Sequence, residues 1–244
     1  MQKTTLNAQE VNQFNDLAAT WWDEDGPMKP LHMLNPTRIQ YLRQQICTHF
    51  SRDVMIETPL KTLDIIDVGC GGGIVCEPLS RLGANVTGLD AAEKNIEVAK
   101  AHAKTHGLSI TYKNDLVENI AKKRKKYDVV LALEILEHVE DIPLFLESCT
   151  KLLKKDGLLI VSTLNRNPKS FLLGIVAAEY ILRWLPRGTH DWHKFLKPSE
   201  IAAHLNPLDL KPKDVTGLVY NPFTKAFSLS NTDLDVNYFM TFSY

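Results

Sequence analysis

Asp67-Val68-Gly69-Cys70-Gly71-Gly72-Gly73 is a glycine-dense turn that follows the mostly apolar run 63–66. Apolar residues at helical spacing come after the turn, and that pattern stops at Gly83. A short apolar run predicts a buried strand, and glycine lets the backbone turn sharply and lie close to a ligand. The order strand, glycine-rich turn and helix is typical of the first unit of a doubly wound sheet, which binds ligands at the carboxyl ends of its strands.

The next predicted strand, residues 85–90, ends in the carboxylate of Asp90. An acidic residue at the tip of the second strand can accept hydrogen bonds from both ribose hydroxyls of a nucleoside. The alternate glycines do not have the G-x-G-x-x-G spacing of dinucleotide sites, and a turn without Lys or Arg cannot be a P-loop. The motif D-x-G-x-G-x-G with a strand-end Asp resembles instead the S-adenosylmethionine site of the class I methyltransferases.

The composition predicts a soluble, cytosolic, globular protein. The 244 residues can bury one good core, and 28 basic residues nearly balance 29 acidic ones, so the net charge gives no argument for a nucleic-acid partner. The N-terminal stretch has no apolar signal segment. The four cysteines are scattered without a C-x-x-C pair, which suits a reducing compartment and argues against a cysteine-based zinc site.

Alternating strand and helix patterns predict an α/β fold with a mostly parallel sheet and helices on both faces. The resemblance to the class I methyltransferases implies a Rossmann-like, seven-stranded sheet with a terminal antiparallel pair. The expected strands are residues 63–66, 85–90, 109–113, 127–133, 157–164, 208–219 and 224–229. We expect a single domain, residues 1–244, with four parts: an N-terminal helical cap (7–50), an S-adenosylmethionine-binding core (63–164), an apolar insert (166–197), and a C-terminal helix and strand pair (198–244).

Three polar residues outside the glycine turn have positions that suggest a role. Asn7 can cap a helix, with Glu10 three residues further on. Arg38 lies just inside a second predicted helix, where its guanidinium can pair with a carboxylate or remain a solvated surface charge. Asp115 follows the third strand, where an acidic side chain could meet an adenine amino group.

The segment Glu134-Ile135-Leu136-Glu137-His138 begins where the strand 127–133 stops, at the same sheet edge as the glycine turn. In one helical turn, Glu134, Glu137 and His138 would face the same way. Two carboxylates and an imidazole can hold Mg²⁺, and a bound ion would lower the pKa of a coordinated phenol or catechol. Alternatively, His138 is itself the general base, or the three side chains only shape a polar loop.

Residues 170–186 form an unexpectedly apolar stretch with basic residues near both ends. The stretch is shorter than the ~20 residues that a transmembrane helix needs. Its composition suits a helix in the interface of an anionic membrane, or a helix buried against the domain or in a dimer contact. The cluster His190-Asp191-Trp192-His193 follows, and its alternatives are a hydrogen-bonded loop, a second candidate base at His190 and a metal-binding pair.

Short motifs across residues 21–238 resemble those of the ubiquinone biosynthesis O-methyltransferases. They include WWD-x-x-G at 21–26, D-V-G-C-G-G-G at 67–73, L-E-H-V at 136–139, A-E-Y-I-L at 178–182 and G-T-H-D at 188–191. The glycine motif alone indicates only the superfamily, whereas A-E-Y-I-L and G-T-H-D are much more specific. Members of this family transfer methyl from S-adenosylmethionine to ring hydroxyls of polyprenylated phenol and catechol intermediates, typically at both O-methylation steps of the pathway.

The resemblance implies that Arg38, Gly69, Asp90 and Leu133 contact S-adenosylmethionine. It also implies that Glu134, Glu137 and His138 correspond to Mg²⁺ ligands described for some members. Because a polyprenyl tail partitions into lipid, the resemblance favours an interfacial role for residues 166–187. We therefore expect peripheral attachment to the anionic inner face of the membrane, with other ubiquinone-pathway proteins as candidate partners.

The expected mechanism is an in-line displacement, in which the ring hydroxyl loses its proton to His138 or to a metal-bound network. The chain has no Tyr-x-x-x-Lys motif of short-chain dehydrogenases, and no Asn- or Asp-Pro-Pro-aromatic motif of nucleic-acid methyltransferases. Two alternatives remain. One is a methyltransferase for another apolar small molecule, and the other is a non-catalytic, membrane-docking protein that only binds S-adenosylmethionine.

Overall fold

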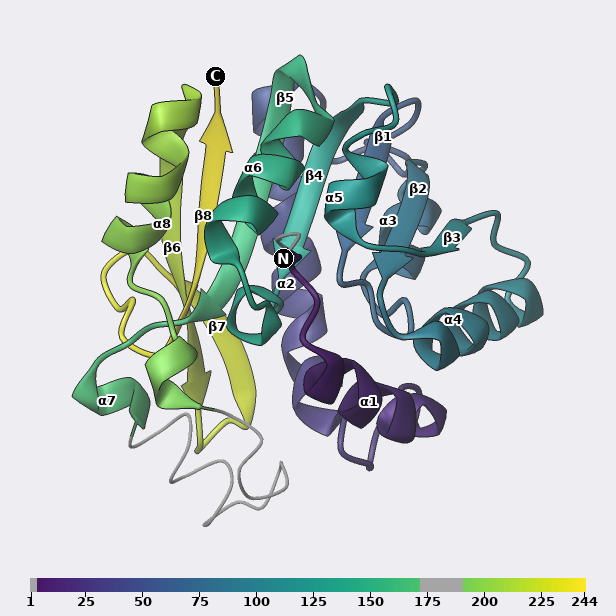
Figure 1. Ribbon diagram of the computed structural model, residues 1–244, viewed down its shortest axis with the longest axis horizontal. Helices are drawn as coiled ribbons and strands as arrows, with labels where there is room; N and C mark the ends of the chain where they lie inside the picture. The colour runs from purple at the N-terminus through teal and green to yellow at the C-terminus, as the bar shows by residue number, and fades with distance from the viewer. Residues whose placement is uncertain (1–3, 172–190) are drawn as a thin grey trace.

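The computed structural model describes residues 4–171 and 191–244, and its centre is one eight-stranded sheet (Figure 1). The strands are β1 (Asp64–Val68), β2 (Asn85–Asp90), β3 (Thr111–Asn114), β4 (Tyr127–Leu133), β5 (Leu153–Leu164), β6 (Lys211–Asn221), β7 (Ala226–Ser230) and β8 (Asn237–Ser243). They lie in the order β3-β2-β1-β4-β5-β8-β6-β7.

The first five strands along the chain form the parallel half of the sheet. β1 lies between β2 and β4, and Ile66 pairs with Thr87 on one side and with Val130 on the other. Near-continuous apolar runs such as β4 suit parallel strands that are covered on both faces. The parallel order brings the carboxyl ends of β1, β2 and β4 to one edge, where Asp90 and Leu133 end their strands.

The antiparallel half contains one strand that the sequence analysis missed. β8 lies between β5 and β6, where Thr241 pairs with Ile160 on one side and with Asp214 on the other. The predicted antiparallel pair of β6 and β7 is confirmed, but the sheet has eight strands rather than seven. All residues of β8 are buried, so polarity does not alternate along it as it does in a strand with one solvated face.

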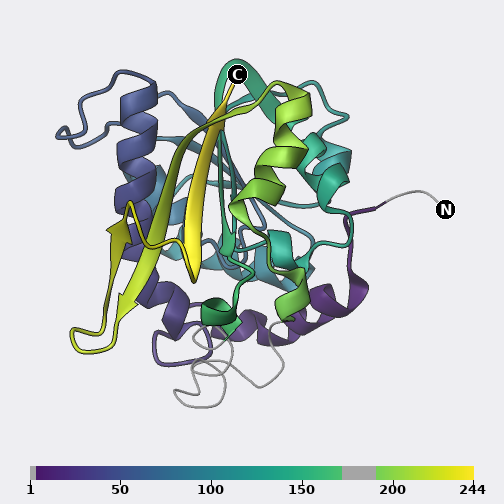
Figure 2. The same ribbon diagram turned by 90° about the vertical axis from the view of Figure 1, so that its left-hand side faces the viewer.

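Helices cover both faces of the sheet. They are α1 (Ala8–Leu17), α2 (Lys29–His49), α3 (Cys76–Arg81), α4 (Glu93–Thr105), α5 (Val117–Ile120), α6 (Ile142–Leu152), α7 (Pro168–Ser170) and α8 (Pro198–Leu205), with 3-10 turns at Ala18–Thr20, Leu136–His138, Trp192–Lys194 and Asn206–Leu208. Figure 2 shows α2 on one side of the sheet and α8 on the other. One hydrophobic cluster joins α2, α3 and α4 to Ile65 and Val129, and a second joins α5, α6 and α8 to Ile66 and Val130. Successive strand residues therefore enter opposite clusters.

The N-terminal helices differ in part from the prediction. Asn7 caps α1 as expected, since its side chain accepts hydrogen bonds from the backbone N–H groups of Gln9 and Glu10. α2 begins at Lys29, earlier than the prediction of Arg38 just inside a second helix implied. A proline at the start of α2 is compatible with helix because no intrahelical N–H bond is needed there. The early start places Arg38 well inside the helix.

The part of the chain that the structure describes has no helix long and apolar enough to cross a membrane. Most of the predicted apolar stretch 170–186 lies outside the described residues, and so does His190. α1 lies beside the carboxyl-terminal edge of the parallel strands (Figure 1), and the candidate site is formed there.

Candidate functional site

The turn after β1 needs its glycines for two reasons. Gly69, Gly71 and Gly73 have φ angles of 81°, 52° and 89°, in the left-handed region that favours glycine. A Cβ on Gly69 would lie 2.7 Å from Ile135, and one on Gly71 would lie 2.2 Å from the ring of Trp21. The turn is therefore packed tightly between the segment after β4 and the N-terminal segment.

Asp90, at the end of β2, fixes the turn and the start of α4. Its Oδ2 accepts a hydrogen bond from the backbone N–H of Gly71 at 2.8 Å, and its Oδ1 accepts one from Ala92 at 2.8 Å. Burial raises the pKa of Asp90, although these backbone hydrogen bonds oppose the rise. Asp90 also lines the cavity described below, so a nucleoside bound there would meet an acidic residue.

Two tryptophans join the N-terminal segment to this turn. Trp21 Nε1 donates to Asn95 Oδ1 at 2.8 Å, and Asn95 Nδ2 donates to Asp90 Oδ1 at 3.4 Å. Trp22 Nε1 donates to the carbonyl oxygen of Gly72 at 3.0 Å. Trp21 also lines the cavity. Asn95 was not predicted, because its hydrogen bonds to Trp21 and Asp90 form only in the folded chain.

Arg38 is a buried cation with unused hydrogen-bond donors. The residue is 4% exposed, and its Nε and Nη2 have no hydrogen-bond partner among the described residues. Burial lowers the pKa of Arg38, while the charges of Glu134 and Asp67 oppose the drop. Unpaired buried donors are costly, so this guanidinium suits an anionic ligand in the cavity. The alternative of a solvated surface arginine is wrong, because Arg38 is buried. The pairing of Arg38 with a carboxylate stays a prediction.

Asp67 places an acidic group close to this cation. Burial raises the pKa of Asp67 to about 6, although the thiol of Cys76 and the charge of Arg38 lower it. The Cys76 thiol donates to Asp67 Oδ2 at 3.4 Å. A guanidinium and a carboxyl group in the same cavity suit a zwitterion, such as the amino-acid part of S-adenosylmethionine.

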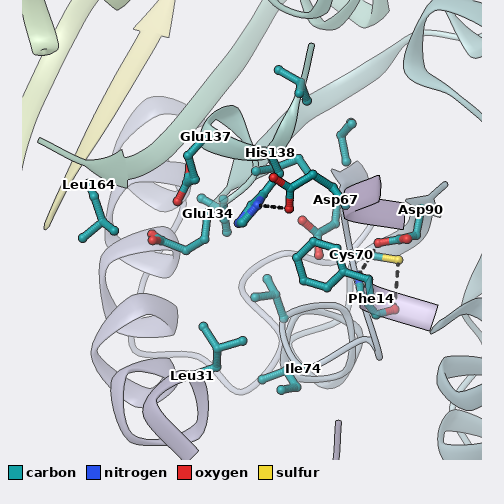
Figure 3. Close-up of a pocket in the computed structure, with 18 of the residues that line it drawn as sticks. Phe14, Leu31, Asp67, Cys70, Ile74, Asp90, Glu134, Glu137, His138 and Leu164 are labelled. Atoms are coloured by element: carbon teal, nitrogen blue, oxygen red, sulfur yellow. Dashed lines mark hydrogen bonds and ion pairs between the residues drawn. The ribbon is translucent and has the colours of Figure 1, made fainter. Parts of the chain in front are cut away.

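One cavity of about 720 Å³ joins these groups (Figure 3). Its volume lies within the roughly 300–1,000 Å³ that is common for small-molecule sites. Figure 3 shows Asp90 at one end of the cavity and Glu137 and Leu164 at the other. Much of the remaining lining is apolar and comes from α1, α2, β6 and β7, including Phe14, Leu31, Leu34, Leu218, Tyr220 and Phe227. Asp115, the predicted adenine contact, lines the cavity and also forms an ion pair with Lys123 at 3.0 Å.

The acidic cluster after β4 does not form one helical turn, contrary to the expectation for residues 134–138. Glu134 has a φ of 51°, and the 3-10 turn begins only at Leu136. The Glu134 carboxylate accepts hydrogen bonds from the Ser162 hydroxyl at 2.6 Å and from the Asn237 amide at 3.1 Å. A non-glycine residue in the left-handed region costs energy, and such residues cluster at functional sites.

Glu137 is a buried carboxyl group in the same segment. It is 3% exposed, and its Oε2 accepts a hydrogen bond from the Thr163 hydroxyl at 2.7 Å. Burial and the negative charge of Glu134 raise the pKa of Glu137 to about 7. Glu137 therefore titrates near neutral pH in the ligand-free protein.

His138 contacts a carboxylate from the other end of the chain. Its Nδ1 lies 3.1 Å from Glu10 Oε2, while Lys194 donates to Glu10 Oε1 at 3.0 Å. Burial alone would lower the pKa of His138, but the hydrogen bond and charge of Glu10, with the charge of Glu137, raise it overall. The hydrogen bond to His138 in turn holds the pKa of Glu10 at about 2. The sequence pointed to Glu10 only as part of a helix cap, because nothing local connects it with His138.

The predicted magnesium ligands do not converge on one point. Glu134, Glu137 and His138 bond to different protein partners, as described above. They are not among the described side chains whose ligand atoms lie within 4.8 Å of one another. Mg²⁺ binds oxygen at about 2.0–2.1 Å, so the ligand atoms around one ion must lie closer to one another than 4.8 Å. The residues therefore do not fit the ion as they stand.

The second histidine cluster is described only in part. Asp191 caps the 3-10 turn Trp192–Lys194, and its Oδ1 accepts a hydrogen bond from the backbone N–H of His193 at 3.0 Å. This contact agrees with the predicted hydrogen-bonded loop. The predicted pairing of His190 with His193 lies outside the described residues.

Comparison with known proteins identifies close relatives over nearly the whole chain. A family model described as a methyltransferase domain matches residues 38–211. The ubiquinone biosynthesis O-methyltransferase of Bartonella quintana is 49% identical, and the alignment covers 98% of this chain and 96% of the relative. The protein of the same name from Roseobacter denitrificans is 48% identical, with 97% and 95% covered.

Solved structures share the fold at much lower identity. The plantazolicin methyltransferase in complex with a substrate analogue and SAH has a TM-score of 0.67 at 15% identity, covering 96% of both chains. The magnesium protoporphyrin IX methyltransferase of Synechocystis PCC 6803 has a TM-score of 0.61 at 18% identity, covering 96% of this chain and 98% of that one. The predicted Rossmann-like methyltransferase fold is confirmed.

Proposed function

The chain belongs to the ubiquinone biosynthesis O-methyltransferases and depends on S-adenosylmethionine, and we propose that its acceptor is a ring hydroxyl of a polyprenylated phenol or catechol. The main support within the structure is that one cavity contains both sets of groups this reaction needs. Arg38, Asp67 and Asp90 suit a zwitterionic nucleoside, and a half-buried histidine, His138, lies in the same cavity beside apolar side chains. An aromatic ring needs such a lining.

The proposed contacts of S-adenosylmethionine are Arg38, Gly69, Asp90 and Leu133. Arg38 offers two donors that have no partner among the described residues to the amino-acid carboxylate, and Asp90 offers carboxylate oxygens to the ribose hydroxyls. Gly69 lets the turn approach the ligand without a Cβ. Leu133 ends β4 and lines the same cavity. When bound, S-adenosylmethionine supplies the methyl group that the acceptor oxygen takes up.

The proposed general base is His138. A phenol has a pKa of about 10 and is mostly protonated at neutral pH, so removal of its proton makes the oxygen a stronger nucleophile. An imidazole is well suited to accept that proton. Glu10 contacts the Nδ1 side of the ring at 3.1 Å, which orients the imidazole, and its negative charge stabilises the imidazolium that forms.

This route needs no metal ion. The magnesium ligands implied by the family resemblance, Glu134, Glu137 and His138, would have to leave some of their present partners before they could share an ion. Chelation of metal ions with EDTA therefore distinguishes the two routes.

The test is methyl transfer from labelled S-adenosylmethionine to a short-chain prenylated catechol and to the matching phenol, with and without EDTA. We expect labelled product from both acceptors, as action at both O-methylation steps requires, and equal rates with and without EDTA. Loss of turnover in EDTA that Mg²⁺ restores would instead assign Glu134, Glu137 and His138 as ligands. Binding of S-adenosylmethionine without transfer to either acceptor would favour another substrate or a non-catalytic role.

We also propose that residues 166–187 attach the protein to an anionic membrane surface. The sequence supports this with an apolar stretch that has basic residues near both ends. Two exposed aromatic side chains add to the argument: Phe171 is 48% exposed and Phe223 is 96% exposed, and Pro222 beside Phe223 lines the cavity. An acceptor with a lipid-soluble tail could then enter the cavity from the membrane.

Sedimentation with liposomes tests the attachment. Changing Ile181 and Trp184 together to Glu should abolish binding to anionic liposomes and leave the affinity for S-adenosylmethionine unchanged. Neutral liposomes are the control for the electrostatic part. Persistent binding of the double variant would show that residues 166–187 are not the anchor.

A further inference from the structure

A cluster of metal-ligand residues lies outside the cavity, between α3 and α4. Glu77, His102 and His106 each offer one ligand atom, and these atoms all lie within 4.8 Å of one another. His102 is on α4 and His106 directly follows it, four positions apart on one side of the helix, with ring centroids 4.2 Å apart. Neither histidine lines the cavity, and the proposed methyl-transfer route does not use them.

The three side chains are already close to the arrangement that an ion requires. His102 Nδ1 lies 2.7 Å from Glu77 Oε1, and a bound ion would replace the proton that these two atoms share, releasing it to solvent. His106 Nδ1 lies 2.9 Å from the carbonyl oxygen of His102, which can only accept, so the proton is on Nδ1 and the lone pair is on Nε2. Zn²⁺ binds nitrogen and oxygen at about 2.0–2.2 Å, so its ligands lie roughly 3.3 Å apart, and only small side-chain rotations are needed.

The cluster is accessible to solvent from the side of His106. The Glu77 side chain is only 4% exposed, and its one cationic side-chain partner besides His102 among the described residues is Arg81, at 3.4 Å. The Arg81 side chain is 52% exposed and can move into solvent. His106 is exposed, so the open side of the cluster can supply water as a further ligand.

We propose that Glu77, His102 and His106 form a binding site for a divalent first-row transition-metal ion such as Zn²⁺. Two imidazoles and one carboxylate favour Zn²⁺, Ni²⁺ or Cu²⁺ over Mg²⁺ and Ca²⁺, which prefer oxygen ligands. The site is separate from Glu134, Glu137 and His138.

The cluster also contacts the N-terminal segment. The indole ring of Trp22 stacks on His102 with centroids 3.5 Å apart and an interplanar angle of 7°, and its Nε1 donates to the Gly72 carbonyl in the glycine turn. A bound ion would therefore lie close to a tryptophan. Ni²⁺ at the site should quench part of the tryptophan fluorescence.

The test is calorimetric titration of the full chain with Zn²⁺ after removal of metals with EDTA. We expect saturable binding of Zn²⁺ that His106→Ala weakens by at least about tenfold. Loss of a hydrogen bond that supports a metal ligand already weakens metal affinity by about this factor, so loss of the ligand itself should weaken it at least as much. Glu77→Gln should weaken binding as well. His49→Ala, which changes a histidine on α2, is the matched control and should bind like the wild type, as should Glu137→Gln, which changes the other candidate site.

Fluorescence gives an independent reading of the same site. Quenching by Ni²⁺ should saturate in the wild-type protein and disappear in His106→Ala. His106 is exposed, so its replacement should not disturb the fold, and a thermal melt without metal checks this. Absence of Zn²⁺ binding in the wild type would overturn the proposal, and so would equal Zn²⁺ affinity and equal quenching in His106→Ala.

Discussion

Replacing Arg38 with Met should weaken the binding of those ligands that carry an amino-acid carboxylate, and of no others. Arg38 is 4% exposed, and its Nε and Nη2 have no partner among the described residues. Methionine is long, unbranched and flexible, so it can fill the space of the arginine side chain while it removes both donors. The variant isolates the hydrogen bonds from the packing.

The expected size of the effect follows from the burial of the guanidinium. A hydrogen bond to a charged group contributes about 1.5–3 kcal/mol to binding or stability. Since 1.4 kcal/mol corresponds to a factor of ten, the loss of one such bond raises the Kd for S-adenosylmethionine roughly 10- to 150-fold, and the loss of both donors should raise it at least that far. S-Adenosylhomocysteine carries the same carboxylate, so its Kd should rise by a similar factor.

Calorimetry with three ligands separates this contact from a general loss of the site. S-Adenosylmethionine and S-adenosylhomocysteine have the carboxylate, whereas 5′-deoxy-5′-methylthioadenosine keeps the nucleoside and lacks it. The Arg38→Met variant should bind methylthioadenosine as tightly as the wild type does. Thermal unfolding of both proteins without ligand is the control for the fold.

Two results would contradict a specific contact between Arg38 and the amino-acid carboxylate. If methylthioadenosine loses as much affinity as S-adenosylmethionine, the substitution has damaged the cavity rather than one contact. If neither ligand loses affinity, Arg38 does not bind the carboxylate, and its unpartnered donors need another explanation.

Three further predictions concern neighbouring residues. Asp90→Ala should weaken S-adenosylmethionine and methylthioadenosine alike, by about 1–3 kcal/mol, because both carry the ribose; calorimetry that finds only one of them weakened would argue against the ribose contact. In denaturant titrations, Gly71→Ala should lower the free energy of unfolding more than Gly107→Ala does. Both glycines have a positive φ (52° and 66°), but an added Cβ meets another group, the ring of Trp21, only at Gly71. Equal losses of stability would mean that the Trp21 ring moves away freely. Glu137→Gln should stabilise the ligand-free protein relative to the wild type, and this stabilisation should grow as pH rises from 4.5 to about 7. In this pH range Glu137 of the wild type is ionised in the unfolded chain but still largely protonated in the folded protein, so the wild type loses stability as pH rises. A melting-temperature difference that is constant with pH would contradict this expectation.

The parallel half of the fold could be predicted because its signals are local. The predicted strands 85–90 and 127–133 coincide with β2 and β4. Each is a short apolar run with a clear end, and parallel strands buried on both faces require that pattern. The glycine turn could be predicted for the same reason, since its residues need both a left-handed backbone and close packing.

β8 and the start of α2 depend on tertiary structure. β8 is stabilised by β5 on one side and β6 on the other, and its burial on both faces removes the alternating pattern of a half-exposed strand. Two prolines argue locally against an early helix start, but one of them occupies the first turn of α2 and the other, Pro36, is accommodated inside the helix. Packing of the helix against the sheet outweighs the local preference of these residues.

The candidate site likewise combines residues that have a local signal in the sequence with residues that only tertiary contacts bring together. Asp90 was predicted because a strand end has positional meaning, whereas the position of Arg38 left a surface arginine open and only the family resemblance implied a ligand contact; both residues line the cavity. Glu10 and Asn95 were not, since their contacts with His138 and Trp21 join segments far apart in the sequence. The left-handed conformation of Glu134 also has no local signal, and it explains why the expected helical turn does not form.

The proposed reaction requires His138 to remove the proton of the acceptor hydroxyl in a cavity that also binds S-adenosylmethionine. Single-turnover methyl transfer to a prenylated catechol, at saturating S-adenosylmethionine, tests this role when the wild type is compared with His138→Gln. We predict a rate about 10²- to 10⁴-fold lower in the variant, the usual contribution of a positioned acid or base, with an unchanged Kd for S-adenosylmethionine. A variant that transfers methyl at the wild-type rate would show that His138 is not the base.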